Sequence, residues 1–332
     1  MEARAVVTPS IGKVEFTSVT VPDPTSEDVV IQITHSWISN GTEGSMIRGE
    51  RIAGDTPRSD SDPMPFPHVP GYQKTGIVEW VGKNVRDIHI GDLVFATVSP
   101  VNAMFYSHGG HVSPAVTHHS QVWKLPPDTN SIAVSGLVLT QVGYNVGMRP
   151  SISEGEAAVV LGDGLVGHWA AQTLQARGAK TLLIGKHKER LEKFEPASGD
   201  GILNLETNDL VDGVRKWSPQ GIKLIADTVG SIPSIETLIP LCVHDSHISS
   251  AGFYGAKGFI DIQKLRDREM TLHAPSGWSK ERMDATLEMI LNGKLRTLPL
   301  ITHHFPVFQA EEAYNMILQR TQPHLGVILD WE

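Results

Sequence analysis

A glycine-rich turn between two apolar runs constrains the fold of this chain more than any other feature. Residues 157–161 form a short apolar run, as expected of a buried strand, and lead into Gly-x-Gly-x-x-Gly at 162–167. A helical pattern follows over 165–177, and a second apolar run spans 180–184. In this context such glycines permit a tight turn and let a pyrophosphate approach the backbone at the start of a helix. We therefore predict dinucleotide binding by Gly162, Gly164, Leu165, Val166 and Gly167.

The end of the second apolar run bears on the choice between the two nicotinamide dinucleotides. An NAD site usually places Asp or Glu there, where the carboxylate binds the ribose 2′-hydroxyl. This chain has Gly185, followed by Lys186, His187 and Lys188. Cations at this position can bind a 2′-phosphate, although a basic helix start is also often only a solvated surface. We predict NADP(H) as the cofactor.

Composition limits the kinds of partner. The 332 residues suffice for two domains, and the formal net charge of −9 argues against a nucleic-acid partner. The single cysteine, Cys242, excludes an internal disulfide framework and a multi-cysteine zinc site. The first residues do not resemble a secretory leader, and no apolar stretch approaches 18 residues. We expect a cytoplasmic protein that binds neither nucleic acid nor membrane.

The pattern of elements changes along the chain. Residues 1 to about 125 carry short apolar or alternating runs broken by Gly, Pro and Asp, which is typical of strands. Beyond residue 131, helical and strand patterns alternate, which predicts an α/β domain with a doubly wound parallel sheet. Asp227 is the last residue of one of these strands, at 224–227, and Thr228 follows it. We expect both residues to face the cofactor, because ligands bind at the carboxyl ends of such strands.

Short segments on both sides of the glycine turn carry a likeness to a known family. They lie at 38–43, 69–76, 91–94, 109–111, 251–254, 300–303 and 328–331. Together with a β-rich domain before a mid-chain Rossmann unit, they resemble the medium-chain dehydrogenase/reductase superfamily, and within it the chain is most similar to the bacteriochlorophyllide a dehydrogenase group. The resemblance implies a GroES-like catalytic domain at 1–125, completed by 276–332, a Rossmann domain at 126–275, and a homodimer.

This chain differs from the zinc enzymes of the superfamily at the positions of their metal ligands. Those enzymes have Cys-Gly-Thr-Asp where this chain has Asn40-Gly41-Thr42-Glu43, and Gly-His-Glu where it has Gly71-Tyr72-Gln73. Their third ligand falls near Val138. Zinc needs thiolate, imidazole or carboxylate ligands, so we predict no catalytic zinc. We interpret the remaining candidate ligands, His108, His111, His118 and His119, as ordinary loop and strand residues that bind no metal.

Without zinc, hydrogen-bond donors must stabilise the developing alkoxide. The candidates are Tyr72, Thr42 and Asn40. By resemblance, Thr42 takes the position of the hydroxyl that begins the proton relay of the family. Tyr72 is the predicted proton donor, because a phenol can donate a hydrogen bond and act as an acid. The alternative is that Tyr72 only packs and Asn40 only caps a turn. We expect Glu43 to support local structure without taking part in the chemistry.

Four aromatic residues are candidates for a substrate pocket, although aromatic side chains more often belong to a core. Trp278 follows Pro275-Ser276-Gly277, near the expected return of the chain to the first domain. The predicted pocket residues are Trp37, Phe253, Tyr254 and Trp278.

Three functions agree with these residues. The leading one is a zinc-independent, NADP(H)-dependent alcohol dehydrogenase or carbonyl reductase acting on a small molecule. The second is an enoyl or quinone reductase acting on an activated C=C bond. The third is a non-catalytic protein that binds NADPH. A panel of ketones and secondary alcohols against enones and quinones separates the first two.

Overall fold

The computed structural model describes residues 1–331, which form two units. Unit 1 comprises residues 1–138 and the segment from Thr297 onward, and unit 2 comprises residues 139–296. The chain thus returns to unit 1 at Thr297, later than the predicted return at 276. The reason is local: the Arg296 N–H donates to Gln172 Oε1 of unit 2 at 2.7 Å, whereas the Thr297 hydroxyl donates to the Ala133 carbonyl of unit 1 at 2.6 Å.

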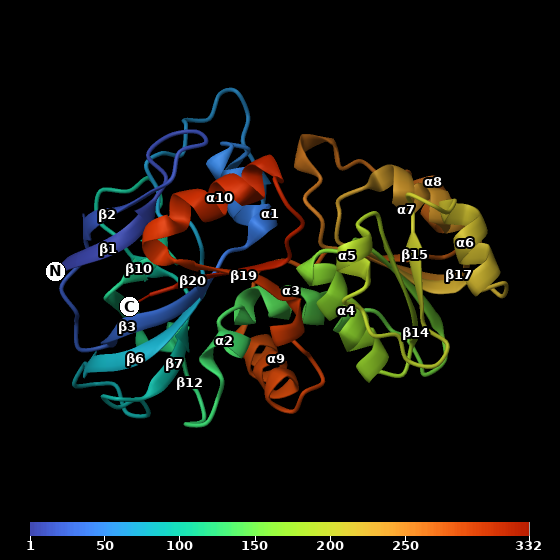
Figure 1. Ribbon diagram of the computed structural model, residues 1–332. Helices are drawn as coiled ribbons and strands as arrows, with labels where there is room; N and C mark the ends of the chain where they lie inside the picture. The colour runs from blue at the N-terminus through green and yellow to red at the C-terminus, as the bar shows by residue number, and fades with distance from the viewer. Residues whose placement is uncertain (332) are drawn as a thin grey trace. The chain divides into compact units, whose positions relative to one another are not determined.

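Unit 2 is built on a six-stranded parallel sheet. Its strands are β13 (Ala157–Leu161), β14 (Lys180–Gly185), β15 (Gly201–Asn204), β16 (Ile222–Asp227), β17 (Cys242–Ser250) and β18 (Thr271–His273). Its helices are α3 (Leu137–Met148, which begins in unit 1), α4 (Leu165–Ala176), α5 (Lys188–Leu191), α6 (Leu210–Trp217), α7 (Ile232–Leu238), α8 (Ile262–Arg266) and α9 (Lys280–Leu291). The strand order is β15-β14-β13-β16-β17-β18 (Figure 1). This order reverses direction beside β13, which is where doubly wound sheets bind their ligands.

The centre of the unit 2 sheet is buried because its strands β13, β14 and β16 are largely apolar. Val159 and Leu161 belong to one buried cluster with residues of β16 and α7, whereas Ala158 and Val160 belong to another with residues of α4. Alternate residues of β13 therefore pack in different clusters, as expected of a strand covered on both faces. The predicted fold class, an α/β protein with a doubly wound sheet, is confirmed.

Unit 1 is β-rich. Its strands are β1 (Glu2–Val7), β2 (Glu15–Thr20), β3 (Asp28–Trp37), β4 (Arg51–Ala53), β5 (Thr56–Pro57), β6 (Lys74–Val81), β7 (Leu93–Ala96), β8 (Ser99–Pro100), β9 (His108–Gly109), β10 (Val112–Ser113), β11 (Ala115–His118), β12 (Val122–Lys124), β19 (Ile301–Pro306) and β20 (Gly326–Asp330). Its other helices are α1 (Asn40–Ile47), α2 (Ser131–Val134) and α10 (Ala310–Gln319).

The long strand β3 organises unit 1. One sheet has the order β12-β7-β6-β3-β20-β19, with β11 also paired to β3, and a smaller sheet has the order β10-β1-β2. Strand β20 comes from the end of the chain and pairs with β3 in antiparallel register, with Ile328 opposite Trp37. Helix α10 packs against α1 and β2 (Figure 1). The C-terminal segment therefore completes the core of this unit.

The helical region that follows residue 130 consists of two helices, α2 and α3, separated at Gly136. A Cβ atom at Gly136 would lie 2.7 Å from the Trp37 ring, so this close packing requires glycine. Within residues 1–331 we find no helix that is long and apolar enough to span a membrane.

Candidate functional site

The carboxyl ends of β13, β14 and β16 meet at one edge of the unit 2 sheet. Two hydrogen bonds link them: the Gly162 N–H donates to the Ile184 carbonyl at 2.8 Å, and the Thr228 N–H donates to the Leu161 carbonyl at 2.9 Å. The structure thus brings together the three predicted cofactor segments, which are the glycine turn, residues 185–188, and Asp227-Thr228. This edge lies at the switch point of the sheet, where dinucleotides bind in doubly wound folds.

The glycine turn leaves the start of α4 open. Gly162 has φ of +116°, a conformation that favours glycine, and a Cβ atom at Gly167 would overlap the Gly162 carbonyl oxygen. Gly164 is the N-cap residue of α4, and among the described residues no side chain caps this end. Apart from its chain neighbours and the backbone of the helix, no described atom lies within 4 Å of where a Gly164 Cβ would be. The first turn of α4 can therefore offer N–H groups to an anion.

An acid lies at the end of β14, contributed by a residue that the sequence analysis passed over. Asp163, from the middle of the glycine turn, accepts hydrogen bonds at Oδ2 from the Lys186 N–H (2.8 Å) and the His187 N–H (2.7 Å). The His187 Nδ1 atom lies 3.0 Å from the same oxygen. A Cβ atom on Gly185 would collide with this carboxylate, so the glycine at this position makes room for Asp163.

The charge of Asp163 is largely compensated within the turn. Burial opposes its ionisation, but the hydrogen bonds from the His187 and Lys186 backbone outweigh this effect and lower the pKa of the carboxyl group. Arg190 adds a further cation, with Nη1 at 3.7 Å from Oδ1. Asp163 therefore organises the segment that carries Lys186 and His187, and both of its oxygens are engaged in doing so.

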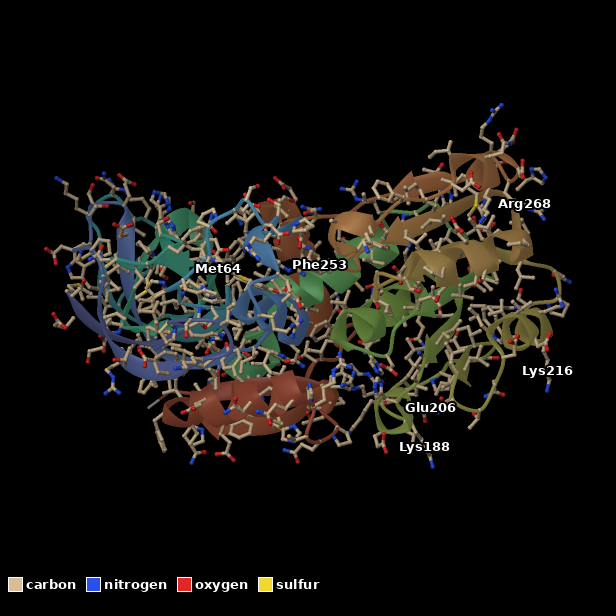
Figure 2. The ribbon with its side chains drawn as sticks, turned by 90° about the horizontal axis from the view of Figure 1, so that it is seen from above. Met64, Lys188, Glu206, Lys216, Phe253 and Arg268 are labelled. Carbon is tan, nitrogen blue, oxygen red and sulfur yellow. The ribbon has the colours of Figure 1, made fainter. Side chains whose placement is uncertain are left out.

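The cationic side chains after β14 differ in their surroundings. His187 is half exposed beside Asp163. Lys188 lies in the first turn of α5, 74% exposed, with its ammonium 3.7 Å from Glu192. Figure 2 shows Lys188 pointing away from the ribbon. The Lys188 ammonium is therefore exposed to solvent and only loosely paired with Glu192.

The Asp227 carboxylate, at the end of β16, is engaged within unit 2. The buried carboxylate accepts the N–H groups of Val229 (3.1 Å) and Gly230 (2.9 Å) and the Tyr254 hydroxyl at 2.6 Å. Burial, together with this carboxylate, raises the pKa of Tyr254. The Tyr254 hydroxyl is thus engaged inside unit 2, which does not favour its predicted contact with substrate.

In unit 1, the predicted proton donor is part of a small hydroxyl cluster. The Tyr72 hydroxyl donates to Ser39 Oγ at 2.7 Å, and the Thr42 side chain also hydrogen-bonds to Tyr72. Burial raises the pKa of Tyr72 to about 12. Ser39 is the N-cap residue of α1, but its hydroxyl does not cap the helix among the described residues. No sequence motif pointed to Ser39 as part of this cluster.

A buried hydrogen-bond network around Glu43 supports this hydroxyl cluster. Glu43 Oε1 accepts the Ser39 N–H at 2.6 Å, and Glu43 Oε2 lies 3.0 Å from His111 Nε2 and accepts the Tyr314 hydroxyl. Glu43, His111 and Tyr314 are completely buried. Burial and the nearby carboxylate raise the pKa of Tyr314. The prediction that Glu43 supports local structure agrees with these contacts, which also connect Glu43 to Tyr72 through Ser39.

Comparisons with known proteins give relatives over the whole chain. The chain is 24% identical to 2-desacetyl-2-hydroxyethyl bacteriochlorophyllide A dehydrogenase of Cereibacter sphaeroides, over 100% of the chain and 99% of the relative. It is 23% identical to D-xylulose reductase of Saccharomyces cerevisiae, over 94% of the chain and 93% of the relative. A solved structure of an Escherichia coli oxidoreductase/dehydrogenase of unknown specificity matches with a TM-score of 0.87 at 18% identity and covers 100% of both chains. No protein-family model matches.

The chain has the medium-chain dehydrogenase fold. The positions at which the zinc enzymes of the resembled superfamily hold their metal fall at or near Asn40, Tyr72, Gln73 and Val138, and these residues decide whether the metal fits. Asn40 Nδ2 donates to the Leu325 carbonyl at 2.7 Å, and Gln73 Nε2 donates to the Trp37 carbonyl at 3.1 Å. Val138 is a buried aliphatic residue. Two amides, a phenol and a valine do not match the ligands that zinc takes.

The predicted pocket aromatics are distributed over both units. Trp37 is fully buried in unit 1, where its ring packs closely against Gly136 and Gly326, so it is a core residue in this structure. Phe253 and Trp278 belong to unit 2 and are half-buried. Tyr254 is half-buried as well, so three of the four predicted residues keep surface that a ligand can contact, and Trp37 does not.

Proposed function

We propose that this protein is an NADP(H)-dependent oxidoreductase that transfers hydride between the nicotinamide and a secondary alcohol or ketone without a catalytic zinc. The observation that carries the proposal is the edge of the unit 2 sheet, where an open glycine turn lies beside a cationic segment. The relatives support the reaction class, because they are alcohol and polyol dehydrogenases.

In this proposal the cofactor is held by two kinds of contact. The N–H groups at the start of α4 bind the pyrophosphate. The Lys186 ammonium and the His187 imidazole bind the 2′-phosphate, and Asp163 fixes the backbone from which both side chains project. Because Asp163 already accepts two N–H groups and lies beside His187 and Arg190, its charge repels a phosphate less than an unpaired carboxylate would.

The proton in this reaction is handled by Tyr72, Ser39 and Thr42. A bound NADPH would supply the hydride, and the carbonyl oxygen of the substrate would then need a hydrogen-bond donor and a proton. With a pKa of about 12, the Tyr72 phenol stays protonated at neutral pH, so it can donate to the developing oxyanion. The Ser39 and Thr42 hydroxyls hydrogen-bond to Tyr72 and can replace the proton that it gives up. Alcohol oxidation reverses these transfers.

The test is a fluorescence titration of the metal-analysed protein with NADPH and NADH, followed by a substrate panel. We expect NADPH to bind at least tenfold more tightly and secondary alcohols or ketones to turn over. Tighter binding of NADH would contradict the cofactor assignment. Turnover of enones or quinones alone would favour a C=C reductase, and binding without any turnover would favour a non-catalytic protein. A stoichiometric zinc lost together with activity would overturn the zinc-free mechanism.

A further inference from the structure

Two of the four histidines that we interpreted as ordinary loop and strand residues come together with a carboxylate on unit 1. In the part of the chain that the structure describes, Glu27, His118 and His119 each offer a ligand atom, and these three atoms lie within 4.8 Å of one another. His111 is buried beside Glu43, and His108 is exposed on β9 beside Ser107. We propose that Glu27, His118 and His119 form a binding site for one divalent cation of the zinc class.

The backbone brings the three residues together. His118 ends β11 and lies opposite Asp28 in the antiparallel pair with β3, so Glu27 is adjacent in the same register. The His119 N–H donates to the Glu27 carbonyl at 3.0 Å, which ties the two chain segments at this point. The His118 and His119 rings lie 4.7 Å apart, centroid to centroid, and 33° from parallel. Strand pairing thus holds two imidazoles and one carboxylate close together before any ion binds.

The ligand atoms can be assigned from the other contacts. His119 Nε2 faces Glu27 Oε2 at 3.6 Å, close to the separation of about 3.4 Å between two ligands on a tetrahedral zinc. The second oxygen of Glu27 accepts a hydrogen bond from Asn84 Nδ2, which orients the carboxylate. His118 Nδ1 lies 2.8 Å from Ser120 Oγ, which leaves His118 Nε2 for the ion. Such outer contacts typically orient the ligands of metal sites.

The donor set indicates the class of ion. Two imidazoles and one carboxylate suit Zn²⁺, Co²⁺ or Ni²⁺ better than Ca²⁺ or Mg²⁺, which prefer oxygen ligands. The side chains of Glu27 and His119 are 41% and 42% exposed, so water can complete the coordination. The ion would join the loop before β3 to the end of β11, and it would take no part in hydride transfer.

The test is a Co²⁺ titration of the chelator-treated full-length protein, followed by visible absorption, with Zn²⁺ as competitor. We expect one ion per chain, and we expect H118Q and H119Q each to weaken its binding at least tenfold while dehydrogenase activity is retained. The control is H108Q, which changes an exposed histidine outside the cluster and should bind Co²⁺ as the unchanged protein does. Circular dichroism checks that each variant is folded.

Two results would overturn the site: no stoichiometric Co²⁺ binding, or equal binding in all variants. If the ion persists in H118Q and H119Q and activity falls when it is removed, both this site and the zinc-free mechanism are wrong. If the ion is lost in these variants and activity persists, a zinc found by elemental analysis belongs to this site. The failure of one proposal is therefore distinguishable from the failure of the other.

Discussion

At the scale of single residues, the Tyr72 hydroxyl is the group whose loss should matter most for catalysis. Tyr72→Phe keeps the ring and removes only the hydroxyl that donates to Ser39. We expect kcat to fall by roughly 10²-fold or more, the range for loss of a general acid or an oxyanion donor, with little change in the binding of NADPH. Steady-state kinetics and a cofactor titration measure both quantities. A kcat within threefold of the unchanged protein would show that Tyr72 only packs.

Lys186 provides the test of cofactor choice. Lys186→Ala removes a cation that projects from the segment held by Asp163. We expect the apparent KM for NADPH to rise by tenfold or more and the KM for NADH to change little, because only NADPH carries the 2′-phosphate.

A matched control for Lys186 is Lys216→Ala, in the last turn of α6. Because helices run antiparallel to the strands in a doubly wound fold, this lysine lies at the other edge of the unit 2 sheet; Figure 2 labels it. Lys216→Ala should leave both KM values unchanged. An equal rise for both cofactors in Lys186→Ala would contradict a phosphate contact.

Lys74 is a completely buried lysine in β6 whose ammonium donates to the Thr97 carbonyl at 2.7 Å. Burial lowers its pKa from 10.5 to about 7. The unfolded chain therefore binds more protons than the folded chain between about pH 7 and 10.5, so the stability contributed by this site rises with pH across that window. Below pH 7 the full destabilising effect is present.

Lys74→Met should therefore raise the free energy of unfolding at pH 7, by roughly 3 kcal/mol. The gain over the unchanged protein should shrink as the pH approaches 10.5. Urea denaturation of both proteins at pH 7 and pH 10 measures the difference. A gain that is the same at both pH values would mean that the lysine is not desolvated in the folded state.

At the scale of elements, the start of α1 depends on Glu43. Its carboxylate accepts the Ser39 N–H at the helix N-cap. It also contacts His111, which directly precedes β10, and Tyr314, which lies in α10. These contacts join three segments that are far apart in the chain. Because all three side chains are buried, removing one leaves polar partners without compensation.

Glu43→Ala should thus destabilise the protein by roughly 3–5 kcal/mol, measured by urea denaturation. Glu43→Gln keeps the shape and some of the hydrogen bonds, so it should cost less and keep more activity. If Glu43 also positions Tyr72 through Ser39, folded Glu43→Gln protein should lose kcat more than NADPH affinity. Unchanged stability in Glu43→Ala would contradict the buried network.

The elements of the Rossmann unit could be predicted closely, because their signals are local. The apolar run at 157–161 is β13 as predicted, and the helix expected over 165–177 is α4, Leu165–Ala176. Strand β2 lacks such a signal, because its alternation is weak: Val19 is its only buried residue. Residues 44–67 include few apolar residues and so carry no periodic signal, yet they contain the end of α1 and the short strands β4 and β5.

The side-chain chemistry of the site was harder to predict because its contacts are not local. Asp163 meets Lys186 and His187 across more than 20 residues, and Glu43 meets Tyr314 across 271. Neither pairing has a periodic signal. The acid at the end of β14 was overlooked because the sequence pattern places it on the strand, whereas here it comes from the turn.

At the scale of the whole molecule, the unpaired edge of the unit 2 sheet bears on assembly. Strand β18 ends the sheet, and Leu272 at its centre is 44% exposed. An exposed edge strand readily pairs with another chain. We expect a homodimer, and light scattering after gel filtration should give about twice the chain mass of 36.2 kDa. A Leu272→Lys variant should shift the protein toward the monomer, and a monomeric unchanged protein would contradict the prediction.

The contact between Asp163 and Gly185 constrains how cofactor preference can evolve. A common route to NAD preference puts an acid at the end of the second strand. Here any side chain at 185 collides with the Asp163 carboxylate, so an acid introduced there alone would displace the turn before it could bind a ribose. An acid at position 185 would fit without displacing the turn only after Asp163 is replaced by a smaller residue. The two positions are therefore epistatic, and a laboratory selection for NADH should recover them as a pair.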